Sequence, residues 1–395
     1  MVHIVFTADN HLGKYYAKMS PNQLSARRKW LREAWKKTID YAIEQGAHIY
    51  LHGGDLFNTP NPRTPELVWV ARQFRRLQDA GIRALLISGN HDVPRSRVGG
   101  ATPQRIYGEL RAARCFTKVT EVEWEIFTID GTTVAIGGLA PDPRLSPDDD
   151  PLDGVRIEPP EADAVVLIVH YGIEGTLPPD AREPQIPRSR IASLGGVDFL
   201  LVGHLHEHIC FKIGSVTVCT SGPTERMDFG EVNVNPGFLS LRLYGKRPVK
   251  SEIKHIPVDP QPMHRLEIRT TNLPKEGVTE YILRRIREVS NPNQLLQCRL
   301  EGPLARDIYR QIRFFDIWRA GNEWNAYFDL DRKAVYIQTD DTFDGASIPR
   351  RVGPIQEIRA VANTLLQEAG DEDREVIEEA LALILQIWEG EEASR

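Results

Sequence analysis

The first 200 residues of this 395-residue chain predict an α/β fold. Short apolar runs typical of buried strands alternate with longer runs that have helical spacing. Polar residues follow directly where several of these strands end. Because alternating strands and helices pack in layers, we expect a sheet with helices packed on it. At about 100 to 200 residues per domain, the chain has room for two or three domains.

Local signals place the elements of the first domain. The helix at about 21–45 begins with a cap at Ser20, a proline at Pro21 and a capping box completed by Gln23. Asp130-Gly131 separates two strand-like runs and predicts a hairpin, and the Pro- and Asp-rich residues 141–163 predict a surface loop. Strands are expected at 1–7, 47–51, 82–87, 119–128, 132–139, 164–169 and 197–202, helices at 21–45 and 64–80, a short helix from Thr102, and further strands between Ile209 and Pro257.

A second unit begins near Asp259-Pro260. It is expected to contain a strand, a helix at 276–289, a strand at 295–301, a helix at 304–313 and then β-like segments to Thr339. The last stretch, 354–389, has helical spacing in two runs that break at Gly370-Asp371. The chain therefore predicts a second domain and a separate helix pair.

The composition is that of an ordinary globular protein. Hydrophobic residues make up 41% and charged residues 26% of the chain, which allows a sizeable core. No apolar run reaches about 18 residues, so we expect no membrane span. The N-terminus lacks the basic flank of a signal peptide, so we expect a cytoplasmic protein. Its four cysteines include no CxxC pair, and we expect them to be reduced and mostly buried.

The net charge of −6 is concentrated at the C-terminus. Residues 371–395 hold nine acidic and two basic residues, a net charge of −7, so residues 1–370 sum to +1. A weak overall charge argues against a protein that binds DNA by electrostatic attraction alone. It does not argue against an enzyme whose positive charge comes partly from metal ions.

Residue types that bind metal ions follow five of the predicted strands. They are Asp9-Asn10-His11, Gly54-Asp55, Asn90-His91-Asp92, His170 and His204-Leu205-His206. Functional sites of open α/β sheets lie at the carboxyl ends of the strands, which is where these residues stand. Residues i and i+2 of an extended segment point the same way, so Asp9 and His11 share one side, as do His204 and His206. Carboxylate, imidazole and amide oxygen together suit Mn, Fe or Zn, and the set is large enough for two ions about 3.5–4 Å apart.

Each motif alone is weak, because a single histidine is more often a hydrogen-bonded structural residue. The occurrence of five motifs in order, each directly after a strand, favours a metal site. We interpret the histidines outside the motifs as structural: His3, His48, His255 and His264. The functions of His52 and His208, which flank the motifs, stay open.

The ordered set DxH…GD…GNHD…H…GHxH resembles the calcineurin-like metallophosphoesterases. Details such as Asp9-Asn10-His11-Leu12-Gly13 and Gly54-Asp55-Leu56-Phe57 are similar to the SbcD-type branch, the nuclease subunit of a double-strand-break repair complex. The resemblance covers about residues 1–210. It implies a metallophosphoesterase β-sandwich flanked by helices (α/β/β/α), with a smaller α+β cap domain and a C-terminal helical segment. The implied domains are 1–258 for the nuclease, 259–345 for a DNA-binding cap and 354–389 for the helix pair.

The resemblance also implies a function for each site residue. Asp9, His11, Asp55 and His206 would hold one metal ion, and Asp55, Asn90, His170 and His204 the other, with Mn²⁺ as the expected metal. His91 would protonate the leaving sugar oxygen, whereas the alternative is a loop histidine bonded to Asp92. Asn58 departs from the family, where His or Asp is usual three residues after the bridging aspartate. Asn58 and Asp92 are therefore candidate orienting residues for His91.

Basic and aromatic residues near the motifs are candidate DNA contacts. They are Lys14, Tyr15, Arg95 and Arg97, for which solvated loop positions are an equal alternative. The basic residues of the first long helix are expected to be a solvated face: Arg27, Arg28, Lys29, Arg32, Lys36 and Lys37. Apolar residues of the same helix supply either ordinary core packing or the surface of a homodimer, the state that the family implies: Trp30, Leu31, Ala34, Trp35 and Tyr41.

The sequence therefore predicts a metal-dependent DNA nuclease. The family implies a 3′-to-5′ exonuclease with endonuclease activity on hairpins or single strands, which acts in double-strand-break repair. It further implies that residues 354–389 dock on an SbcC-type ATPase, whereas the alternative is a helix pair that closes its own bundle. Two rival functions are a small-molecule or nucleotide phosphodiesterase of the same superfamily and a non-catalytic scaffold. The cap and tail argue against the first rival, and the full ligand set with His91 argues against the second.

Overall fold

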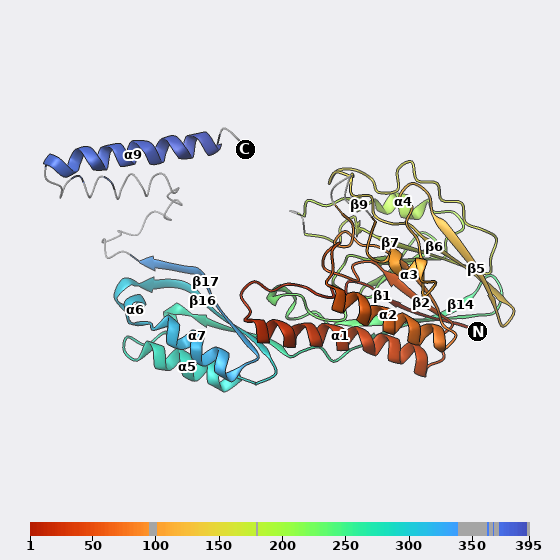
Figure 1. The fold of residues 1–395 in the computed structure, drawn as a ribbon, viewed down its shortest axis with the longest axis horizontal. Coiled ribbons are helices and arrows are strands. Elements are labelled where there is room, and N and C mark those ends of the chain that lie inside the picture. The colour runs from red at the N-terminus through yellow and green to blue at the C-terminus, as the bar shows by residue number, and fades with distance from the viewer. Residues whose placement is uncertain (95–100, 179–180, 339–361, 363–365, 367–370, 393–395) are drawn as a thin grey trace. The chain divides into compact units, whose positions relative to one another are not determined.

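The computed structural model describes residues 1–94, 101–178, 181–338, 362, 366 and 371–392 (Figure 1). Met1–Gln338 form one compact unit and Thr339–Arg395 a second. No helix among these described residues is both long enough and apolar enough to span a membrane.

The first sheet of the N-terminal unit has six strands in the order β14-β13-β1-β2-β3-β4. The neighbours β1, β2, β3 and β4 run parallel, while β13 pairs antiparallel with β1 and with β14. Their bounds are β1 Val2–Thr7, β2 Ile49–Gly53, β3 Arg83–Ile87, β4 Arg114–Cys115, β13 Gly237–Tyr244 and β14 Lys250–Pro257. The three long parallel strands bring their carboxyl ends to one edge of the sheet.

The second sheet also has six strands, in the order β11-β12-β10-β7-β6-β5. Its centre is parallel, and a hairpin at each edge, β5–β6 and β11–β12, is antiparallel. Their bounds are β5 Glu123–Ile129, β6 Thr132–Gly138, β7 Ala164–His170, β10 Phe199–Gly203, β11 Cys210–Ile213 and β12 Val216–Thr220. The hairpin at Asp130-Gly131 is thereby confirmed, with Asp130 and Gly131 both at positive φ. A small pair, β8 Gly172–Ile173 and β9 Gln185–Ile186, lies outside this sheet.

The two sheets pack face to face. One apolar cluster takes Ile4 and Phe6 from the first sheet and Val166 and Ile168 from the second. The helices α1 (Pro21–Glu44) and α2 (Thr64–Asp79) cover the outer face of the first sheet, where Trp35 is fully buried (Figure 1). The outer face of the second sheet packs against loop residues and the short helix α4 (Arg188–Ala192). The predicted helix-flanked β-sandwich is confirmed.

Several basic residues of α1 are not solvated, contrary to our prediction. The side chain of Arg27 is 1% exposed and forms an ion pair with the buried Glu225. Arg28 donates to the backbone carbonyls of Gly13 and Lys14, and Arg32 makes a bidentate pair with Glu66. Helical spacing placed these residues away from the apolar stripe, but neighbouring loops and α2 cover that side of the helix.

A three-stranded parallel sheet, β15-β16-β17, follows the sandwich. Its strands are β15 Met263–Arg269, β16 Leu295–Ala305 and β17 Tyr327–Gln338, and its helices are α5 Val278–Val289, α6 Arg306–Gln311 and α7 Phe314–Trp324. The helix α7 corrects our prediction of β-like segments after 313. Its aromatic residues favour strands locally, but Ile317 and Gly321, four residues apart, are buried in a helix, and Gly321 lies directly against Phe328.

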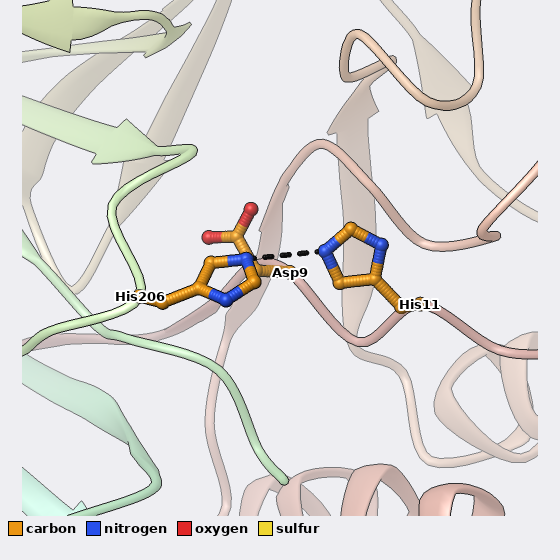
Figure 2. A group of neighbouring side chains, drawn as sticks. All are labelled: Asp9, His11 and His206. Carbon is orange, nitrogen blue, oxygen red and sulfur yellow. Dashed lines mark hydrogen bonds between the residues drawn. The ribbon is translucent and has the colours of Figure 1, made fainter. Parts of the chain in front are cut away.

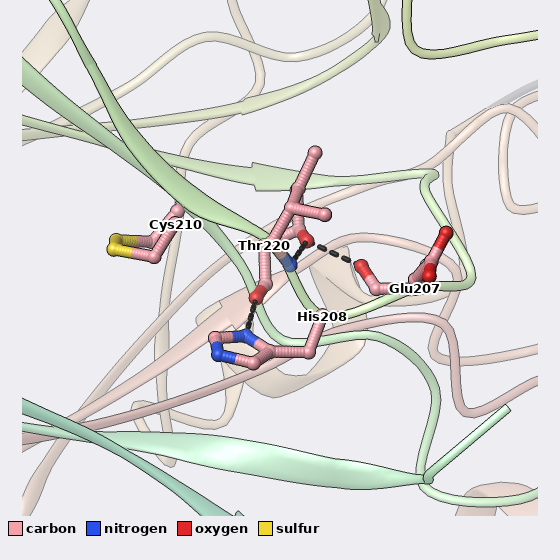
Figure 3. The surroundings of a disulfide bond; sticks show 6 residues. Glu207, His208, Cys210 and Thr220 are labelled. Carbon is pink, nitrogen blue, oxygen red and sulfur yellow. Dashed lines mark hydrogen bonds between the residues drawn. A yellow bond between two sulfur atoms is a disulfide. The ribbon is translucent and has the colours of Figure 1, made fainter.

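The cysteines also depart from our prediction, since Cys210 and Cys219 form a disulfide (Figure 3). The antiparallel pairing of β11 with β12 puts the two residues directly opposite each other, with 4.2 Å between their Cα atoms. Only the strand register reveals this proximity, because the residues are nine positions apart in the sequence. Cys115 and Cys298 are free and buried, as predicted.

The C-terminal unit contains the helix α9, Asp371–Glu392, which agrees with the second helical run predicted from the sequence. Most of the first run, 354–369, lies outside the described residues. The predicted domain bounds at 258, 345 and 354 stay predictions.

Candidate metal centre

The candidate ligands lie where the parallel strands of both sheets end. Asp9 and His11 follow β1, Asp55 follows β2, His170 is the last residue of β7, and His204 follows β10. The two sheets approach closely here: a Cβ on Gly203 would lie 2.1 Å from the carbonyl oxygen of Gly53 on the other sheet. Only glycine permits this approach, which brings the ligands of the two sheets within reach of one another.

The backbone at the site is held in an unusual conformation. Asp9, His11, Asp55 and His204 all have a positive φ, between 46° and 83°. Residues with a side chain seldom adopt this left-handed region, and each such residue costs on the order of 1–3 kcal/mol. Backbone hydrogen bonds compensate, because the N–H groups of Asp9 and His11 donate to the carbonyls of Gly54 and Asp55 at 3.0 Å. Strain of this kind clusters at functional sites.

The side chains of Asp9, His11 and His206 form one group (Figure 2). Their nearest ligand atoms all lie within 4.8 Å of one another. The Nε2 atoms of His11 and His206 face each other at 3.2 Å, and Asp9 is fully buried. The Asp9 carboxylate also accepts hydrogen bonds from the backbone N–H of His204 at 2.9 and 3.0 Å.

A second group lies on the other side of the Asp55 carboxylate. Nε2 of His170 is 3.5 Å from Oδ2 of Asp55 and 3.0 Å from Oδ1 of Asn90. Asp55, Asp9 and His170 again have ligand atoms within 4.8 Å of one another, and Asp55 also groups with His11 and His91. Asp55 therefore lies between the two groups, the position that a bridging carboxylate requires.

His204 is oriented differently from the other predicted ligands. Its ring lies against that of His170, with 5.3 Å between the ring centroids, but its Nε2 faces Oε2 of Glu183 at 2.5 Å. The structure thus brings together Asp9, His11, Asp55, Asn90, His170 and His206, with His204 at their margin.

Hydrogen bonds set which nitrogen of His170 faces the centre. Its Nδ1–H donates to the backbone carbonyl of Gly53 at 2.7 Å, which leaves Nε2 toward Asp55. Burial alone would lower the pKa of His170, but the carboxylates of Asp55 and Asp9 outweigh it and raise that pKa to about 9. The pKa of Asp55 is lowered: burial opposes this shift, and the neighbouring His170 and His11 produce it. Asp55 and His170 thus form a buried pair of opposite charges, whereas burial raises the pKa of Asp9 and lowers the pKa of His11, which favours their neutral forms.

His91 lies at the exposed rim of the centre. Its backbone N–H donates to Asp55 Oδ1 at 2.9 Å, and its ring meets that of His11 edge to face, with 4.8 Å between the centroids. The buried Asp92 carboxylate accepts hydrogen bonds from the backbone N–H groups of Leu56, Phe57 and Gly89. These bonds join the two loops that carry Asp55 and His91, so Asp92 fixes their backbone.

Asn58 has a buried Oδ1 atom with no hydrogen-bond partner among the described residues. Lys14 and Tyr15 follow the first ligand loop, and Tyr15 is 66% exposed. Arg95 and Arg97, the other candidate DNA contacts, lie outside the described residues.

Three functional candidates were missed or left open by the sequence analysis. His52 is fully buried, accepts a hydrogen bond from the N–H of Gly54 on Nδ1, and contacts Asn10 Oδ1 through Nε2 at 2.6 Å. Burial lowers the pKa of His52 to about 3, so it is a neutral support for the ligand loops. Glu183 contacts His204, and Glu231 contacts His206. Each glutamate is more than 20 residues away from its histidine in the sequence, in a segment without the spacing of a helix or strand. Only the fold reveals their position.

Two hollows adjoin the centre. One, of about 500 Å³, has His91, His206 and Glu231 in its wall, and the other, of about 350 Å³, has Asn90, Tyr171 and Pro141. Asn90, Glu183 and His204 line both. The candidate centre is therefore open to a substrate on two sides.

The donor set fits two divalent metal ions. Buried carboxylates and imidazole nitrogens converge from separate loops, and Nδ1 of His11 is buried without a hydrogen-bond partner among the described residues. Facing imidazole nitrogens beside an aspartate are a ligand set suited to Mn, Fe or Zn.

The chain matches the calcineurin-like phosphoesterase family over residues 2–208 and belongs to it. It is an enzyme, a metal-dependent hydrolase of phosphodiesters. Members of this family use a dinuclear metal site, and the clusters described above are the candidate ligands for such a site in this chain.

Its similar relatives include three curated archaeal proteins, each named DNA double-strand break repair protein Mre11. That of Saccharolobus solfataricus is 28% identical over 71% of this chain and 69% of its own length. Those of Methanocaldococcus jannaschii and Sulfolobus acidocaldarius are each 26% identical, over 57% and 78% of this chain and 56% and 77% of their own lengths.

Proposed function

We propose that this protein is a two-metal DNA nuclease that acts in the repair of double-strand breaks. The observation that carries the proposal is the convergence of Asp9, His11, Asp55, His170 and His206 from both sheets on one centre, with His91 at its rim. The names of the similar archaeal proteins support DNA repair as the setting.

In the proposed site, Asp9, His11, Asp55 and His206 hold the first ion, and Asp55, Asn90, His170 and His204 the second, with Mn²⁺ as the expected metal. Two such ions, when bound, supply an activated water and neutralise charge on the phosphoryl oxygens. His91 faces the leaving group from the rim and donates a proton to its sugar oxygen. Asp92 positions the loop of His91 through its hydrogen bonds to Leu56, Phe57 and Gly89, and Asn58 is proposed to orient the His91 ring; neither touches the substrate.

The substrate we propose is the end of a DNA duplex, cut in the 3′-to-5′ direction, with endonuclease cleavage of hairpins and single strands. Lys14, Tyr15, Arg95 and Arg97 would contact its phosphates. The sheet β15–β17 with its helices would act as the cap that guides the duplex. Support for this placement comes from two hydrogen bonds to the cap, both at 2.9 Å: Lys18, in the turn before α1, donates to Asp329, and Gln23, in the first turn of α1, donates to Asn322.

The first experiment measures cleavage of end-labelled duplex DNA and of a small chromogenic phosphodiester, each with Mn²⁺ and with EDTA. His91→Ser should lower DNA cleavage about 100- to 10,000-fold, the usual contribution of a general acid, while bound metal is unchanged. His48→Ser is the matched control, because His48 directly precedes β2 and so lies at the opposite end of that strand from Asp55. Turnover of the small diester with intact DNA would instead indicate a small-molecule phosphodiesterase.

We further propose that residues 354–389 dock on an SbcC-type ATPase, that the enzyme is a homodimer and that it works in the cytoplasm. The apolar positions of α9 recur with helical spacing, which supports a docking function. A chain that ends at residue 353 should lose ATPase binding and keep its metal-dependent cleavage. Retained binding would contradict the docking proposal, and light scattering of the full chain tests the dimer.

A further inference from the structure

The carboxylate of Glu231 fixes the ring of His206. Oε1 of Glu231 accepts a hydrogen bond from Nδ1 of His206 at 2.6 Å, and Oε2 accepts one from the backbone N–H of Met227, also at 2.6 Å. The Glu231 side chain is only 16% exposed. Both oxygens are engaged, so the carboxylate cannot turn away from the imidazole without breaking a hydrogen bond.

The segment that carries Glu231 is itself held in place. Glu231 ends the short 3₁₀ helix η1, Phe229–Glu231, and the Asp228 side chain caps this turn by accepting from the N–H of Gly230 at 2.6 Å. Arg265, on β15, donates to the backbone carbonyl of Phe229. Glu231 thus presents its carboxylate from a fixed position rather than from a free loop.

The other ring nitrogen of His206 points into the centre. With Nδ1–H given to Glu231, Nε2 keeps its lone pair, and it lies 3.2 Å from Nε2 of His11 beside the Asp9 carboxylate. A carboxylate on the far nitrogen of a metal-binding histidine fixes the tautomer and the ring orientation and makes the near nitrogen a better ligand.

We propose that Glu231 is a positioning residue that holds His206 in the tautomer and orientation needed to bind the first metal ion. The inference rests on the metal site proposed above. Loss of such a partner typically weakens metal binding about 10- to 100-fold. Only the site that contains His206 should be affected, because His170 uses the backbone carbonyl of Gly53 for the same purpose.

Calorimetric titration of the metal-stripped full chain with Mn²⁺ tests the proposal. Wild type should bind two ions, and Glu231→Ala should weaken one of the two sites about 10- to 100-fold while the other is unchanged. Glu231→Gln keeps one oxygen that can accept from Nδ1–H of His206, so it should lose less Mn²⁺ affinity than Glu231→Ala. Glu207→Ala is the matched control, since it removes an exposed acidic residue next to His206 in the same loop.

Equal titrations for Glu231→Ala and Glu207→Ala would overturn the positioning proposal alone. Wild type that binds fewer than two ions would overturn the metal site as well, so the two failures are distinguishable. Nitrogen NMR of histidine-labelled, metal-free protein gives a second measurement. His206, assigned with His206→Gln, should carry its proton on Nδ1 in wild type and lose this preference in Glu231→Ala. An unchanged tautomer would also refute the proposal.

Discussion

Substitution of Arg27 should destabilise the protein strongly, whereas substitution of an arginine on the surface should change the free energy of unfolding very little. Arg27 and Glu225 are 1% and 0% exposed and pair directly. Arg27 also donates to Gln261 Oε1 at 2.9 Å, and the backbone N–H of Gln261 donates to Glu225 at 2.9 Å. This network joins α1 to the loop after β12 and to the segment that enters β15.

The expected magnitude follows from what each substitution leaves behind. Arg27→Met leaves the Glu225 carboxylate buried without its cation, which costs about 3–5 kcal/mol of the free energy of unfolding. The double variant Arg27→Met, Glu225→Leu removes both charges and leaves only neutral hydrogen-bonding groups unpaired. This should lower the free energy of unfolding by about 1–3 kcal/mol. The double variant should therefore be more stable than the single one.

The assay is equilibrium unfolding in urea, followed by tryptophan fluorescence and by far-ultraviolet circular dichroism. Two probes are needed, because a chain with several domains can unfold in more than one step. Arg75→Met is the matched control: Arg75 pairs with Asp79 on α2, but the two side chains are 71% and 62% exposed. This exposed pair should contribute about 0.5 kcal/mol or less. A cost for Arg27→Met no greater than that of Arg75→Met would refute the reasoning.

Four further predictions concern the metal centre and the thiols. Because a metal ion must displace the proton of His170, whose pKa is about 9, the affinity for Mn²⁺ should rise about tenfold per pH unit between pH 6.5 and 8.5. An Mn²⁺ affinity that calorimetry finds to be independent of pH would contradict this prediction. A saturating excess of Mn²⁺, about 100 times the dissociation constant, should stabilise the fold by about 2.7 kcal/mol per site, so EDTA should lower the melting temperature. Asn58→Asp should leave the metal content unchanged and alter the cleavage rate, and identical kinetics would remove Asn58 from the site. Denatured, unreduced protein should present two thiols to a thiol reagent, those of Cys115 and Cys298, whereas four would exclude the disulfide.

The sequence predicted those features that depend on short-range signals. The capping box of Ser20 and Gln23 is present at the start of α1. The ends of the strands were also predictable, because turn residues and residue types that bind metal ions directly follow the apolar runs. Parallel strands then bring Asp9 and Asp55 to one edge without any further information.

Features that depend on contacts between distant segments were not predictable. Arg27 reads as a solvent-facing helical residue, and only the loop that carries Glu225, 198 positions later, shows that it is buried. Glu231 stands in no motif, and its contact with His206 depends on the return of the chain after β12. For α7, packing of Gly321 against Phe328 overrides the strand preference of its aromatic residues.

Because the two sheets each supply part of the ligand set, the order of folding bears on when the chain becomes able to cut. A folding intermediate with only the first sheet would present Asp9, His11, Asp55 and Asn90, and one with only the second would present His170, His204 and His206. Neither half has enough donors to retain two ions, so a nascent or partly unfolded chain would carry no cutting centre. For an enzyme proposed to degrade DNA, this division of the ligands means that only the fully folded chain could cleave DNA.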